Sequence, residues 1–278
     1  MSRVAAIQMA SGPNVNANLL EAERLIARAA KAGAKLVVLP ENFAIMGMTE
    51  YDKVKVREID GKGPIQNFLA DVSARYGIWL VGGTVPMAAR DPAKVNAACL
   101  VYNDKGQRVA RYDKIHLFDV LLTESGEHYN ESATIESGGD VVVIDTPFGR
   151  LGLAICYDLR FPELFRRMVQ ENVEIIVIPS AFTAITGRAH WETLIRARAI
   201  ENLSYVIASA QGGYHANGRE THGDSMIVDP WGIVLDRLQR GSGVVVSDID
   251  LHRLADIRRS FPALEHRRIN CILGQSQA

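Results

Sequence analysis

A cysteine at the end of an apolar run is the residue in this sequence best suited to do chemistry. Residues 151–155 are Leu-Gly-Leu-Ala-Ile and lead directly into Cys156, and Pro162 then suits the first turn of a helix. The sequence therefore predicts that Cys156 lies on a strand-to-helix turn at the carboxyl edge of a sheet, where open α/β proteins bind ligands. N–H groups at a helix start would favour its thiolate. The competing interpretation is a small buried hydrophobic residue, the usual role of an unpaired cysteine.

Three charged residues stand where an apolar core does not explain them. Glu41 and Lys114 each follow an apolar segment that resembles a strand, and Glu131 lies in a loop. A carboxylate beside a cysteine can act as a general base, and a lysine ammonium can stabilise an oxyanion. Taken singly, each is better explained as a solvated charge at a loop start, and it is the occurrence of three suitable residues together that favours chemistry. Strand ends converge at one edge of an α/β sheet, so Glu41, Lys114 and Cys156 are predicted to meet there.

The elements that must position these residues alternate along the chain. Amphipathic helices are predicted over 16–31, 65–76 and 191–202 and after Pro162, and strands over 4–8, 36–39, 78–81, 96–102, 108–112, 141–144, 151–155, 175–178, 205–210, 225–229, 233–238 and 244–249. Such an alternation with inserted hairpins predicts an α/β fold in which helices cover mixed sheets. No linker or repeat divides the chain, so we expect one domain over 1–268 and a polar tail over 269–278.

Composition limits the classes of partner and cofactor. The 278 residues carry a net charge of −1, which gives no indication of a nucleic-acid or anionic-membrane partner. No apolar run approaches the roughly 20 residues of a membrane span, and we expect no signal peptide because the short apolar segment at the amino terminus lacks the long h-region of one. Three scattered cysteines do not form a disulfide framework, so we expect a reducing cytoplasm. We expect no metal and no cofactor, because metal-ligand spacing, a dinucleotide fingerprint and a phosphate loop are all missing.

Three blocks of the sequence resemble the signature blocks of the nitrilase (carbon–nitrogen hydrolase) superfamily. They are Pro-Glu-Asn at 40–42, Tyr-Asp-Lys-Ile-His-Leu-Phe at 112–118 and Cys-Tyr-Asp-Leu-Arg-Phe-Pro-Glu at 156–163. The resemblance extends from the first strand to about residue 268, and three blocks in the right order are a specific match. It implies a single-domain α-β-β-α four-layer sandwich, commonly paired as a homodimer.

The resemblance also implies roles for individual residues. Cys156 would be the nucleophile, Glu41 the general base and Lys114 the oxyanion stabiliser, with Glu131 supporting the base or positioning substrate. The backbone N–H of Tyr157 would complete the oxyanion hole. A thiolate would attack an amide carbonyl, ammonia would leave, and water would release a carboxylate from the resulting thioester.

The neighbours of the cysteine favour one branch of the superfamily. True nitrilases carry Cys-Trp-Glu, whereas Cys-Tyr-Asp, as found here at 156–158, is the form seen in amidase branches. Segments 179–187, 189–192, 196–202 and 229–232 resemble the Nit subgroup, which contains amidases acting on deaminated glutathione and ω-amidases acting on α-ketoglutaramate. The Ala-His-Trp-Glu block at 189–192 favours the first activity. The alternatives are the ω-amidase and a non-catalytic interaction protein of the same fold, against which the complete catalytic set argues.

Within this subgroup, Arg160, Phe182 and Thr186 match positions that contact substrate. Arg160 would bind a carboxylate with two parallel hydrogen bonds, Phe182 would form an apolar wall, and Thr186 would donate one hydrogen bond. The competing interpretations are a structural ion pair for Arg160 and core packing for Phe182. One position departs from the subgroup, since Asp224 stands where a histidine is common, and this weakens the assignment of the far end of the pocket.

Overall fold

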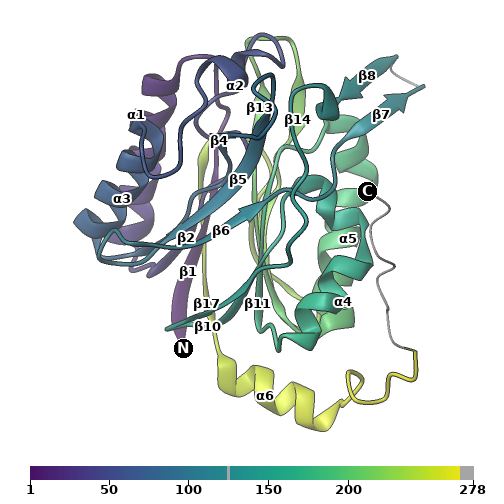
Figure 1. Ribbon diagram of the computed structural model, residues 1–278. Coiled ribbons are helices and arrows are strands. Elements are labelled where there is room, and N and C mark those ends of the chain that lie inside the picture. Colours follow the sequence, from purple (N-terminus) through teal and green to yellow (C-terminus); the bar gives the residue numbers. More distant parts are fainter. Residues whose placement is uncertain (124–125, 270–278) are drawn as a thin grey trace.

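Two β-sheets packed face to face form the centre of the computed structural model, which describes residues 1–123 and 126–269 (Figure 1). The first sheet has the order β17 (Gly243–Ile249), β1 (Ser2–Gln8), β2 (Leu36–Val38), β3 (Trp79–Val81), β5 (Val95–Tyr102) and β4 (Val85–Ala88), with β6 (Arg108–Asp113) also paired to β5. The second has the order β16 (Val234–Leu238), β15 (Ser225–Val228), β12 (Tyr205–Ala210), β11 (Ile175–Ser180), β10 (Gly149–Leu153) and β9 (Val143–Thr146).

Helices cover the outer face of each sheet. Figure 1 shows α1 (Val15–Lys31) and α3 (Pro64–Tyr76) on the first sheet, and α4 (Pro162–Gln170) and α5 (Ala184–Asn202) on the second. Smaller elements are the helices α2 (Asp52–Lys55) and α6 (Leu251–Ser260), the 3₁₀ turns 131–133 and 156–160, and the hairpins β7 (Asp119–Leu122) with β8 (Glu127–Asn130) and β13 (Gly212–Tyr214) with β14 (Glu220–His222). The predicted α-β-β-α sandwich is confirmed.

Alternation along β1 shows how the sequence builds these layers. Val4 and Ala6 belong to the core that the two sheets share, whereas Ala5 and Ile7 pack in the core beneath α1 and α3. Successive side chains of a strand point to opposite faces, so a fully apolar strand serves both cores. Strands β1, β2 and β3 are parallel, and so are β10, β11 and β12. The carboxyl ends of each set lie at one edge of its sheet, and the loops that follow them carry polar residues.

The helix boundaries follow local capping. The side chain of Asn14 accepts a hydrogen bond from the backbone of Ala17 at 3.0 Å and caps α1, and Pro162 is the first residue of α4 as predicted. The start predicted for α5 at Trp191 is wrong: the helix begins at Ala184, because Thr183 caps it and tertiary packing accommodates Gly187 in its first turns. Helix α6 was not predicted. Of the expected tail, residues 270–278 lie outside the described residues.

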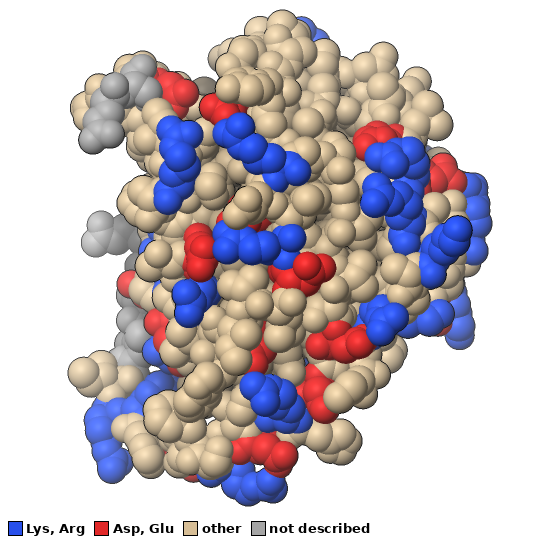
Figure 2. All heavy atoms as spheres, turned by 180° about the vertical axis from the view of Figure 1, so that it is seen from behind, with Lys and Arg blue, Asp and Glu red and all other residues tan. Residues whose placement is uncertain are grey.

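The surface carries charges of both signs. In the view from behind, Lys and Arg side chains are interspersed with Asp and Glu over the whole face (Figure 2). This face has no extended field of one sign, as the net charge of −1 leads one to expect. Within the described ranges, no helix has both the length and the apolar character needed to cross a membrane.

Candidate active site

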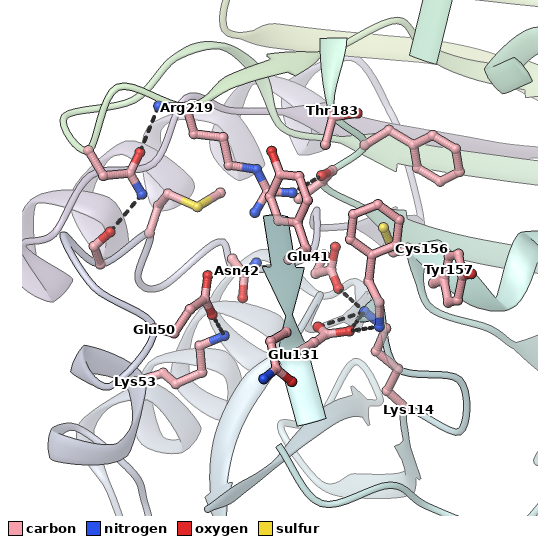
Figure 3. Close-up of a pocket in the computed structure, with 18 of the residues that line it drawn as sticks. Glu41, Asn42, Glu50, Lys53, Lys114, Glu131, Cys156, Tyr157, Thr183 and Arg219 are labelled. Atoms are coloured by element: carbon pink, nitrogen blue, oxygen red, sulfur yellow. Dashed lines mark hydrogen bonds and ion pairs between the residues drawn. The ribbon is translucent and has the colours of Figure 1, made fainter. Parts of the chain in front are cut away.

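A buried lysine lies at the centre of the site. Lys114 follows β6, and its side chain is 1% exposed. Its Nζ lies 2.8 Å from Oε1 of Glu41 and 2.8 Å from both carboxylate oxygens of Glu131 (Figure 3). Burial lowers the pKa of Lys114, but the charges of Glu131 and Glu41 outweigh it and hold that pKa well above its ordinary value. Lys114 therefore keeps its positive charge, and its two carboxylate partners hold the ammonium group in place.

Glu41 is held by its backbone as well as by the lysine. It lies just beyond β2 and is 4% exposed. Its carbonyl oxygen accepts a hydrogen bond from Nε2 of Gln211 at 3.0 Å, and the next residue, Asn42, turns the chain with a φ of 56°. Burial raises the pKa of Glu41, but the neighbouring Lys114 more than offsets this and the pKa falls below its ordinary value. Glu41 is thus ionised and able to accept a proton.

Glu131 closes the other side of the lysine. It begins the 3₁₀ turn that follows β8, and its Oε2 also accepts the backbone N–H of Phe118 at 2.7 Å. With Lys114 contacting both of its oxygens, the Glu131 carboxylate has its orientation fixed. Glu131 therefore holds the lysine toward Glu41.

Cys156 lies between β10 and α4, as predicted, on a short 3₁₀ turn. It is 8% exposed, has a φ of 48°, and lines the same pocket as Glu41. The expected thiolate is wrong: burial and the Glu41 carboxylate raise the Cys156 pKa well above its ordinary value, outweighing Lys114. Helix α4 begins at Pro162, six residues beyond the cysteine, and Cys156 itself begins the short 3₁₀ turn 156–160. Cys156 rests as a thiol beside its base.

A buried aspartate fixes the turn that carries the cysteine. Asp158 accepts the hydroxyl of Tyr112 at 2.7 Å and the backbone N–H of Ile155 at 2.8 Å. It also bonds His116 twice, at the backbone N–H (3.0 Å) and at Nδ1 (2.7 Å). The His116 ring stacks on Phe161, with centroids 3.7 Å apart. This network ties the cysteine turn to the end of β6, from which the lysine extends.

The four predicted substrate-contacting residues, Tyr157, Arg160, Phe182 and Thr186, line the pocket in front of the cysteine. The Arg160 guanidinium lies 5.8 Å from the ring centroid of Tyr157 and 5.4 Å from that of Phe182, and no carboxylate of the described chain pairs with it. A structural ion pair therefore does not explain Arg160. Phe182 also packs edge-on against Trp191 at 4.9 Å, so it serves both pocket wall and core. Thr186 Oγ1 lies 2.8 Å from Thr183 Oγ1.

A second arginine in this pocket was not predicted from the sequence. Arg219 lies in the loop between β13 and β14, lines the pocket, and donates from Nη2 to the carbonyl oxygen of Ala181 at 2.8 Å. Its guanidinium lies over the ring of Tyr129, 5.1 Å from the centroid. The ion pair between Glu50 and Lys53, 2.6 Å long, lines the pocket as well. No local sequence motif marks Arg219 or the Glu50–Lys53 pair as pocket residues, because only the tertiary fold brings them to the pocket.

Asp224 lies outside this pocket. It is 4% exposed, its Oδ1 accepts Nε of Arg237 at 2.9 Å, and its carbonyl oxygen accepts the indole N–H of Trp191 at 2.8 Å. Its position joins α5 to β16 rather than forming a wall beside the cysteine. Asp224 is therefore not part of the pocket wall beside the cysteine.

The site has the groups needed for acyl transfer. A thiol, a carboxylate in the same pocket and a buried ammonium provide a nucleophile, a base and a cation for a developing oxyanion. Within the described ranges, no group of three or more His, Cys, Asp or Glu side chains is arranged to hold a metal ion.

Comparison with known proteins identifies the family. The family model described as carbon-nitrogen hydrolase matches residues 3–259. A deaminated glutathione amidase from Synechocystis sp. is 42% identical over 266 residues, which cover 95% of this chain and 97% of that protein. The human deaminated glutathione amidase is 38% identical over 268 residues, covering 95% and 82% respectively.

Solved structures of similar fold support the same family assignment. Nit3 of Saccharomyces cerevisiae, a member of branch 10 of the nitrilase superfamily, has a TM-score of 0.86 and 31% identity, covering 96% of this chain and 97% of its own. The C. elegans NitFhit protein has a TM-score of 0.88 and 35% identity, covering 96% of this chain and 65% of that longer one. The chain therefore belongs to the carbon-nitrogen hydrolase family.

Proposed function

We propose that this protein is an amidase that hydrolyses deaminated glutathione through a cysteine thioester. The observation that carries the proposal is the buried set of Cys156, Glu41 and Lys114 in a pocket whose Arg160 has no carboxylate partner in the described chain. Relatives with this name match across almost the full chain at 38–42% identity. The complete set argues against a non-catalytic role.

The first half of the reaction forms the thioester. Glu41 accepts the thiol proton as the sulfur of Cys156 bonds to the amide carbon, and the carbonyl electrons move to oxygen. Lys114 and the backbone N–H of Tyr157 stabilise that oxyanion. The C–N bond then breaks as Glu41 passes its proton to the leaving nitrogen. Because the resting thiol has a raised pKa, proton transfer must accompany attack.

The second half releases the acid. Water attacks the thioester while Glu41 takes one of its protons, and collapse of the tetrahedral intermediate breaks the C–S bond. The proton returns from Glu41 to Cys156. Throughout, Glu131 keeps Lys114 in place through contacts of 2.8 Å. Water is the one co-reactant that the second half consumes, and the first half needs none beyond the amide itself.

The substrate suits this pocket at its acyl end. Deaminated glutathione is glutathione with a keto group in place of the γ-glutamyl amino group, so its acyl part ends in a carboxylate. Arg160, four residues beyond the nucleophile and flanked by Tyr157 and Phe182, would bind that carboxylate. With this substrate, the leaving group is the amine of cysteinylglycine. With α-ketoglutaramate, a primary amide, the leaving group is ammonia.

We also propose that the protein pairs as a homodimer in the cytoplasm. Trp231 and Phe261 pack against each other at 5.6 Å between ring centroids yet are 54% and 51% exposed. Ile200 on α5 is 47% exposed, so apolar surface is available on the helix face for a second copy. The three cysteines without a disulfide framework support a reducing compartment. Light scattering and fractionation test the two statements.

A substrate panel tests the proposed activity. Product release is measured with deaminated glutathione, α-ketoglutaramate, a simple nitrile and an N-carbamoyl amino acid. We expect the highest kcat/KM with deaminated glutathione, no turnover by Cys156→Ser, and normal turnover by Cys99→Ala, the matched change at a cysteine buried in the core. Turnover of the nitrile alone, or preference for α-ketoglutaramate, contradicts the proposal. Intact-protein mass spectrometry should detect the acylated enzyme in the wild type.

A further inference from the structure

Arg219 is a pocket cation whose hydrogen-bonding capacity is largely unused. Its Nη2 donates to the carbonyl oxygen of Ala181 at 2.8 Å, whereas its Nε is buried and has no hydrogen-bond partner. No carboxylate of the described chain lies within ion-pair distance of it. A buried donor left without a partner destabilises the protein, and more so when the group is charged. Because the guanidinium lines the pocket and no carboxylate of the described chain pairs with it, its charge points to an anion supplied by a ligand.

The surrounding loop holds Arg219 in place. Its backbone N–H donates to Oδ1 of Asn217 at 3.0 Å, and Nδ2 of Asn217 donates to the carbonyl oxygen of Gly47 at 2.8 Å. The guanidinium also lies over the Tyr129 ring at 5.1 Å. Contacts from three separate segments therefore orient the side chain before any ligand binds, which reduces the entropy lost on binding.

The two pocket arginines belong to different walls. Arg160 lies with Tyr157 and Phe182 on the side of the nucleophile turn. Arg219 extends from the β13–β14 loop into the pocket toward Glu41, as Figure 3 shows. Its charge is among those that lower the pKa of Glu41. Arg219 therefore lies on the side where the general base acts.

The reaction requires the leaving group of the substrate to face the Arg219 side of the pocket, while its acyl part faces the Arg160 side. Deaminated glutathione has two carboxylates, one on its acyl part and one on the glycine of its leaving group. The leaving nitrogen must face Glu41, because Glu41 gives it a proton. We propose that Arg219 binds the glycine carboxylate of the leaving group and so determines specificity for deaminated glutathione over α-ketoglutaramate. This inference rests on the proposed function, and it assigns Arg219 to binding, not to bond making.

Three substrates with the same acyl part test the assignment. They are deaminated glutathione, its analogue with a C-terminal glycinamide, and α-ketoglutaramate. For Arg219→Gln we expect kcat/KM to fall about 10- to 100-fold with deaminated glutathione, the range of a charge-assisted hydrogen bond, mainly through KM. The other two substrates lack the glycine carboxylate and should change less than about twofold. Arg219→Lys should recover part of the loss.

Two control variants separate this role from a structural one. Arg240→Gln removes a neighbouring cation, which is paired with Glu220 at 2.8 Å outside the pocket, and should leave all three substrates unaffected. Arg160→Gln should weaken all three, because they share the acyl carboxylate. An equal loss with all three substrates in Arg219→Gln overturns the inference alone. A wild-type enzyme that does not hydrolyse deaminated glutathione overturns both the inference and the proposed function.

Discussion

Lys114 shares one positive charge between the buried carboxylate of Glu41 and the partly buried carboxylate of Glu131. The three side chains together carry a net negative charge in a site that excludes most water. Removing the cation would leave two carboxylates facing each other without compensation, a situation that costs far more than losing a surface ion pair. The charge of Lys114 is therefore needed for the stability of the fold as well as for the proposed reaction.

Lys114→Met should lower the free energy of unfolding by about 3–5 kcal/mol at neutral pH. In the wild type, Lys114 lowers the pKa of Glu41 below 4.5, so this pair stabilises the fold above that pH and less as pH falls through the folded pKa. In the variant, burial alone raises the pKa of Glu41, which destabilises the fold as pH rises. The difference between the two proteins should thus grow from about pH 4 to about pH 7.

Urea denaturation over that pH series measures the difference. Lys53→Met is the matched control, because its partner Glu50 has a side chain that is 52% exposed, and it should cost at most about 1 kcal/mol. A deficit in Lys114→Met that is independent of pH, or largest in acid, contradicts the prediction.

The resting thiol gives a second prediction at this scale. After burial, the Glu41 carboxylate is the largest factor that raises the pKa of Cys156. Glu41→Gln should therefore lower the pKa of Cys156 while also decreasing kcat at least about 100-fold through loss of the base. Thiolate absorbance, titrated against pH with Cys156→Ser subtracted as background, measures the first effect. An unchanged or higher pKa in Glu41→Gln contradicts the electrostatic account.

At the scale of the element, the nucleophile turn is strained where the chemistry needs it. The φ of Cys156 is 48°, in the left-handed region that residues with a Cβ avoid at a cost of about 1–2 kcal/mol. The hydrogen bonds that Asp158 accepts from three residues hold the turn in this conformation. Strain at one residue is thus offset by its neighbours.

A glycine at this position should relieve the strain. We expect Cys156→Gly to unfold at a higher temperature than Cys156→Ala, with an advantage of up to about 1 kcal/mol, because glycine adopts a positive φ freely. Both variants lack the thiol, so their comparison isolates the backbone. Equal melting temperatures, or a more stable alanine variant, would show that the turn is relaxed.

The elements show what a sequence reveals and what it hides. Periodicity located α1 and α4 and nearly all sheet strands, because burial against one neighbouring layer leaves a local pattern. The start of α5 was hidden, since Gly187 and the β-branched residues near it are weak helix formers that tertiary contacts accept. The four charged and nucleophilic positions were inferred from strand ends and motif resemblance. Arg219 was not, because a residue in a short loop leaves no pattern of its own.

At the scale of the whole molecule, the site exists only while the two sheets are packed together. Glu41 and Lys114 follow strands of the first sheet, whereas Cys156 follows a strand of the second. A buried network joins the sheets beside them: Nε2 of Gln211 donates to Ser11 Oγ at 2.8 Å and to the Glu41 carbonyl oxygen at 3.0 Å. No rigid element carries the full catalytic set.

Loss of activity should therefore coincide with global unfolding. In increasing urea, initial rates and far-ultraviolet circular dichroism should share one midpoint, because separating the sheets removes the base from the nucleophile. Gln211→Met, which removes the link to Ser11 and Glu41, should shift activity to a lower midpoint than circular dichroism. Activity lost well before unfolding in the wild type would show that the site loosens independently of the sheets.

The excess negative charge around Lys114 should also favour release of the product over its retention in the site. An uncharged amide enters beside Glu41 and Glu131, but hydrolysis produces an anion at that same position. Repulsion between like charges then speeds departure of the acid and makes it a poor inhibitor, even though Arg160 still faces its other end. Inhibition by α-ketoglutarate should tighten in Glu131→Gln, as measured by Ki. The two carboxylates that hold Lys114 in place thus also promote release of the acid product.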